Sequence, residues 1–171
     1  MKKNNNSNKD FNKSSIKMLI VGVVLGMVLM GVIAWNMMPN MMINVHESKL
    51  NFEDTILAIN QSAAESNGWK IPVIHDLQAS LVKAGHTDMT KVKVVELCHP
   101  HYAYDVLQPD EDKKISAIMP CRVSVYEDKE GNVYLAEMNT KLVSKMFGGN
   151  IAKVMQVVAE EQAAMFENIM E

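Results

Sequence analysis

The residues with the clearest chemical potential are two cysteines with histidines and a methionine close to them in the chain: Cys98, His99, His101, Met119 and Cys121. Thiolates, thioethers and imidazoles are the ligands that copper prefers, and thiolates and imidazoles also bind zinc. Haem iron takes the same three residue types. We therefore treat these five as candidate metal or redox residues. The sequence does not choose among copper, zinc and haem.

Four interpretations of the cysteine pair remain open. A disulfide would add about 3 kcal/mol of stability, and it needs Cα atoms less than about 7 Å apart. A metal site needs a bend at Pro100, because Cys98 and His99 point to opposite faces of a strand. Thiol redox catalysis lacks a C-x-x-C motif here. Finally, both cysteines could be small core residues, since Cys121 alternates with Val123 and Val125.

Familiar catalytic motifs are absent from the sequence. It has no Ser/His/Asp order, phosphate-binding glycine loop, HExxH motif or dinucleotide fingerprint. The sequence therefore leans away from an enzyme and leaves a binding module or an interaction domain as the main alternatives.

An apolar segment near the N-terminus predicts a membrane helix over residues 16–36. Met18 to Trp35 contains no charged residue, and eighteen helical residues span roughly 27 Å, close to the thickness of a bilayer core. A cleaved signal peptide has a shorter apolar region and small residues at the cut. Ala34 is instead followed by Trp35, Asn36 and two methionines, so we expect an uncleaved anchor that ends at Pro39.

Charge predicts the orientation of this anchor. Five lysines and one acid before residue 18 give that segment a charge of +4, which leaves −7 for the rest of a chain whose net charge is −3. Positive charge stays in the cytoplasm. We therefore expect a single pass through the cytoplasmic (inner) membrane, with a disordered cytoplasmic tail over 1–15 and a linker over 37–43. The domain over 44–171 would be periplasmic or extracellular, and its acidity argues against nucleic acid as a partner.

Local patterns predict a small α+β domain. We expect strands over 42–47, 69–75, 92–98, 118–126 and 133–138, with a hairpin turn at 130–132. Helices are predicted after the caps Asn51 and Asp76, around 102–107, over 140–147 and from Ile151 to Ile169. Residues 109–114 are expected to form a charged loop. Pro72 indicates that the second strand either lies at an edge of a mainly antiparallel sheet or begins near this proline.

Three stretches of sequence resemble the bacterial and archaeal family called domain of unknown function 302. They are GWKIPVIHDL from Gly68, VVELCHP from Val94 and IMPCRVSVYED from Ile118. The family often has asparagine at the position of His99. The resemblance implies one domain of TATA-binding-protein-like topology, β-α-β(4)-α, that tends to form a homodimer. It implies no established reaction.

Overall fold

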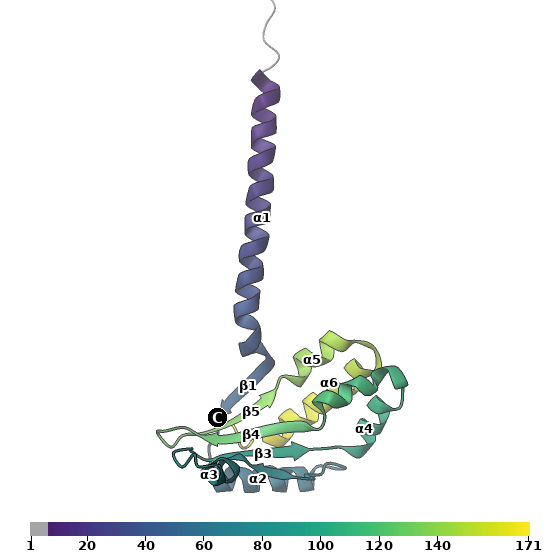
Figure 1. Cartoon of the computed structure of the whole chain (residues 1–171). Helices are drawn as coiled ribbons and strands as arrows, with labels where there is room; N and C mark the ends of the chain where they lie inside the picture. The colour runs from purple at the N-terminus through teal and green to yellow at the C-terminus, as the bar shows by residue number, and fades with distance from the viewer. Residues whose placement is uncertain (1–6) are drawn as a thin grey trace, which may run out of the picture. The chain divides into compact units, whose positions relative to one another are not determined.

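The computed structural model describes residues 7–171, with side chains from Ser15 onward. The chain divides into two compact units, residues 1–40 and residues 41–171, and each is described by itself (Figure 1).

The first unit is built on helix α1, which spans Ser7–Met42. Its segment Ser15–Met42 is long and apolar enough to cross a membrane. The predicted end at Pro39 is wrong, since the helix continues through this proline to Met42. A proline removes one backbone hydrogen bond, which the remaining bonds of a long helix can tolerate. Helical structure therefore covers residues 7–15 of the expected tail and most of the expected linker, while residues 1–6 lie outside the described part.

A five-stranded antiparallel sheet forms the centre of the second unit. Its strand order is β1-β5-β4-β3-β2. The strands are β1 Ile43–Glu47, β2 Ile74–Asp76, β3 Val92–Leu97, β4 Cys121–Glu127 and β5 Val133–Met138. β2 lies at an edge of the sheet, one of the two alternatives that Pro72 indicated. The sheet confirms the α+β class and its mainly antiparallel pairing.

Helices connect and cover these strands (Figure 1). They are α2 Phe52–Glu65, α3 Leu77–Lys83, α4 Pro100–Leu107, the 3-10 helix η1 Asp110–Ile118, α5 Thr140–Phe147 and α6 Gly149–Phe166. The two predicted caps are confirmed: Asn51 accepts a hydrogen bond from the backbone N–H of Asp54, and Asp76 accepts one from Ala79. The order is β-α-β(4)-α with short helices inserted.

The core lies between one face of the sheet and helices α2 and α6. Alternate strand residues supply Val95, Leu97, Val123, Val125 and Leu135, and the helices supply Phe52, Ile59 and Phe166, all at most 2% exposed. A smaller cluster of Val106, Ile115, Ile151 and Met155 joins α4, η1 and α6. These two clusters fix the positions of α4 and α6 relative to the ends of β3 and β4.

Three predicted segments differ from the structure, two of them beside prolines. The strand expected over 69–75 is regular only from Ile74, and Lys70 forms an isolated bridge with Cys98. Similarly, β4 begins at Cys121 rather than at Ile118, because Pro120 has no N–H to donate to a ladder. The charged loop over 109–114 is instead the first part of η1, whose Ile115 is buried.

Candidate functional site

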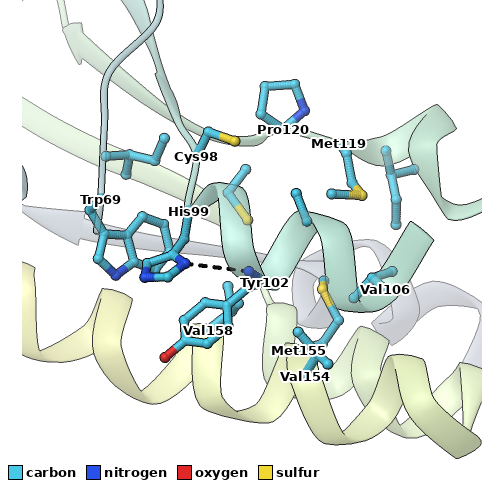
Figure 2. A pocket seen from close by; sticks show the side chains of 14 residues that line it. Trp69, Cys98, His99, Tyr102, Val106, Met119, Pro120, Val154, Met155 and Val158 are labelled. Atoms are coloured by element: carbon cyan, nitrogen blue, oxygen red, sulfur yellow. Dashed lines mark hydrogen bonds between the residues drawn. The ribbon is translucent and has the colours of Figure 1, made fainter. Parts of the chain in front are cut away.

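An apolar pocket lies where β3 ends and β4 begins. It holds about 430 Å³ of empty space, a volume that includes its solvent-filled mouth. Figure 2 shows the side chains that line it. They come from the ends of both strands, from α4, from the segment before β4 and from α6: Trp69, Leu97, Cys98, His99, Tyr102, Ala103, Val106, Ile118, Met119, Pro120, Cys121, Val154, Met155 and Val158.

Both cysteines line this pocket, and both are free thiols in the structure. Cys121 opens β4 directly opposite Leu97, so Cys98 follows one residue after that pair. In Figure 2 the sulfur of Cys98 points towards Pro120. The two cysteines thus line the same pocket, and the structure does not join them by a disulfide. Their role as a metal-binding or redox pair stays a prediction.

The pocket keeps both thiols in their neutral form. Burial raises the pKa of the Cys121 thiol to about 11, with a smaller contribution from Cys98 and Glu137. Burial also raises the pKa of Cys98, and the nearby Glu96 carboxylate adds to this effect. Nucleophilic and redox-active cysteines need a lowered pKa. These environments therefore do not favour thiol catalysis.

His99 has a structural role at the start of α4. Its Nδ1 accepts a hydrogen bond from the backbone N–H of Tyr102 at 3.3 Å, so it is the N-cap of this helix. Asparagine would serve the same role at this position, because it is among the most favourable N-cap residues. The imidazole also stacks on Tyr102, with ring centroids 3.9 Å apart, and lies edge-on to Trp69.

Gly68 has no Cβ and therefore leaves room for the His99 ring. Its φ is +84°, and a Cβ built on it would lie 2.3 Å from His99 Nε2. We expect Gly68→Ala to destabilise the protein by roughly 1–3 kcal/mol more than Gly131→Ala, because overpacking adds to the cost of a positive φ. Gly131 has a similar φ of +92° and no atom within 4 Å of its Cβ position. Urea unfolding of the two variants measures the difference, and equal costs would exclude the contact with His99.

Glu161 on α6 holds two aromatic side chains of the pocket wall. Its carboxylate accepts a hydrogen bond from Trp69 Nε1 and another from the Tyr102 hydroxyl, each at 2.7 Å. Burial alone would raise the pKa of Glu161, but these two hydrogen bonds, together with the charge interaction with His99, outweigh it and lower the pKa. Local sequence patterns do not reveal this group, because Glu161 lies 92 residues from Trp69 and 59 from Tyr102.

The remaining candidates divide between the pocket and the surface. Met119 lines the pocket, although it precedes β4 instead of alternating with Cys121 along the strand. His101 is exposed and does not line the pocket. Among the described side chains, residues 15–171, no group of three or more His, Cys, Asp or Glu is arranged to hold a metal ion.

Comparison with known proteins identifies the domain and leaves its reaction open. The chain is similar to a solved structure titled "Crystal structure of uncharacterized conserved protein DUF302 from Bacillus stearothermophilus", with a TM-score of 0.65 and 20% sequence identity. The match covers 75% of this chain and 98% of that chain. No curated protein matches. The family model described as domain of unknown function DUF302 matches residues 44–171, and the chain therefore belongs to the DUF302 family.

Proposed function

We propose that this protein is a membrane-anchored binding module whose DUF302 domain takes a small, largely apolar ligand into the pocket between α4 and α6. The observation that carries this proposal is the pocket itself, which is lined mainly by aliphatic, aromatic and sulfur-containing side chains. Concave apolar sites with a few polar groups are typical of small-molecule binding. The Cys98 and Cys121 thiols and the His99 ring supply the polar groups here.

The pocket favours a neutral ligand. Both lining thiols have raised pKa values and stay uncharged at neutral pH. No carboxylate is among the residues that line the pocket, and Glu161 behind its wall already accepts hydrogen bonds from Trp69 and Tyr102. A charged ligand would therefore lose its hydration without gaining an ionic partner, which is costly in an apolar site.

Methyl NMR of residues 44–171 tests the pocket directly. The solved relative consists almost entirely of the matched domain, which supports the use of this fragment. With methionine methyl groups labelled, we expect toluene to shift the Met119 and Met155 signals and to leave the exposed Met146 unchanged. Ala103→Leu should abolish these shifts, because Ala103 lines the pocket, whereas Ala163→Leu on the exposed side of α6 should not. Equal shifts in both variants would refute the proposal.

A soft metal ion is the second candidate for this pocket. Four lining residues carry sulfur, namely Cys98, Met119, Cys121 and Met155, and such a set suits copper(I). The pocket suits zinc or haem less well. His99 Nδ1 already accepts the hydrogen bond that caps α4, so this nitrogen is not free to bind a metal. In the same NMR experiment, one equivalent of copper(I) that shifts both methyl groups, with no response to toluene, would favour the metal.

The anchor and its orientation belong to the same proposal. Helix α1 has the length and composition of a membrane span, and the lysines before it favour an N-terminus in the cytoplasm. For the full chain in a bacterial inner membrane, we expect resistance to alkaline extraction. Protease added to spheroplasts should digest the DUF302 domain and spare an N-terminal tag. Digestion of the tag with an intact domain would instead show the opposite orientation. Homodimerisation stays a prediction from the family resemblance.

A further inference from the structure

A surface next to the end of the apolar helix differs from the rest of the domain. We call it the α5 surface, and it consists of Met41, Ile43, Lys141, Lys145, Met146 and Phe147, all exposed. All six residues belong to the compact unit 41–171.

Hydrogen bonds connect the residue before α5 to the last residues of the candidate span. The backbone N–H of Asn139 donates a hydrogen bond to the Met42 carbonyl at 2.8 Å, and its side-chain amide donates one to the Met41 carbonyl at 3.0 Å. Asn139 is also the N-cap of α5, because its side chain accepts a hydrogen bond from Leu142 N–H. Helix α5 therefore begins beside the point where the span ends.

Helix α5 exposes apolar side chains that the core does not use. Val143 and Ser144 are buried against the domain. Met146 and Phe147 are 66% and 44% exposed. At the end of the candidate span, Met41 and Ile43 are likewise 51% and 54% exposed. Neighbouring apolar side chains left in water often mark an interaction site.

The charge of this surface also differs from the rest of the domain. Between residues 139 and 150 the only charged residues are Lys141 and Lys145, whereas the chain after residue 17 carries a net charge of −7. Lysines beside exposed apolar side chains are typical of helices that lie in a membrane interface and contact anionic lipids.

We propose that α5 lies on the surface of the membrane that α1 spans, with Met146 and Phe147 inserted at head-group level and Lys141 and Lys145 against lipid phosphates. This inference rests on the proposed anchoring. A bilayer fits better than a protein partner, because α5 begins beside the last residues of the candidate span and carries lysines suited to anionic head groups. Contact between α5 and the membrane would restrict the orientation of the DUF302 domain relative to the bilayer.

Fluorescence quenching by brominated lipids tests this contact on the full chain in phosphatidylcholine–phosphatidylglycerol nanodiscs. We expect the tryptophan introduced by Met146→Trp, in a Trp35→Phe background, to be quenched and to emit at shorter wavelength than in water. The matched control is Leu57→Trp in the same background, because Leu57 is 64% exposed on α2. Buried Trp69 gives the same background signal in both proteins.

The outcomes separate this proposal from the anchor. The native Trp35 of the unmodified chain reports whether α1 is in the bilayer. Quenching of Trp35 without quenching at position 146 would leave the anchor standing and overturn the α5 contact, as would equal quenching at positions 57 and 146. Unquenched Trp35 would overturn both. The double variant Lys141→Glu/Lys145→Glu should reduce quenching at position 146 in anionic discs and have less effect in phosphatidylcholine alone.

Discussion

At pH 8, Cys121 in the folded protein is expected to react with iodoacetamide about 100-fold more slowly than an unperturbed cysteine. The reactive species is the thiolate, and burial raises the pKa of this thiol from its ordinary value of 9.0 to about 11. At a fixed pH of 8, a pKa that is higher by two reduces the thiolate population by about 100-fold. Mass spectrometry of the alkylated protein over time measures the rate at each cysteine.

The variants Cys98→Ser and Cys121→Ser assign the two rates, and the urea-unfolded chain supplies the unperturbed reference. Because the raised pKa favours the protonated folded state, its contribution to stability is complete below pH 9 and is lost as the pH rises towards about 11. A folded Cys121 that reacts as fast as in urea would contradict this environment and revive thiol catalysis. A folded protein without free thiols would instead support the disulfide interpretation.

Local sequence signals predicted most of the fold. The helix over 140–147 has the predicted bounds, and Asn51 and Asp76 cap helices as expected. Alternation along β4 correctly placed Val123 and Val125 in the core. The predicted starts of two strands were wrong at prolines, because proline has no backbone N–H to donate to a neighbouring strand. Pro72 and Pro120 delay the starts of β2 and β4, and neither effect is visible in hydrophobic alternation.

The candidate site was only partly predictable, because half of it comes from distant segments. Cys98, His99, Met119 and Cys121 do line one pocket, since they flank the ends of two paired strands. Ligand chemistry suggested a metal role for His99, whereas the structure uses its ring as a helix cap that packs on Gly68. Such a role depends on the conformation of another segment, so the sequence around His99 alone does not reveal it.

The α6 wall of the pocket shows the same limit more clearly. Val154, Met155 and Val158 recur at helical spacing along α6, a pattern typical of an inward face, and all three line the pocket. Periodicity treats the other face of the helix as solvated, and so it gave no role to Glu161. A glutamate between an indole and a phenol becomes visible only when α4, α6 and the segment before β2 are packed together.

Glu161→Ala is expected to lower the free energy of unfolding by about 2–4 kcal/mol. The carboxylate accepts two hydrogen bonds at 2.7 Å, and bonds to a charged group contribute about 1.5–3 kcal/mol each, less where solvent competes. The substitution also leaves Trp69 Nε1 unpaired in a side chain that is 5% exposed. Urea unfolding at pH 7 measures the loss. The control is Glu160→Ala, an exposed neighbour whose carboxylate bonds only Gln156 among the described contacts, with an expected change below about 0.5 kcal/mol.

Acid should reproduce part of the effect of Glu161→Ala, because the two hydrogen bonds keep the pKa of Glu161 below its ordinary value of 4.5. The stability that this group contributes is present above pH 4.5 and is lost as the pH falls below it. The variant should therefore lose less stability than the native protein between pH 5 and pH 3. It should also bind toluene more weakly at pH 7, since the Trp69 and Tyr102 side chains would no longer be held in place. A variant with reduced stability but unchanged binding would show that Glu161 supports the fold without shaping the pocket.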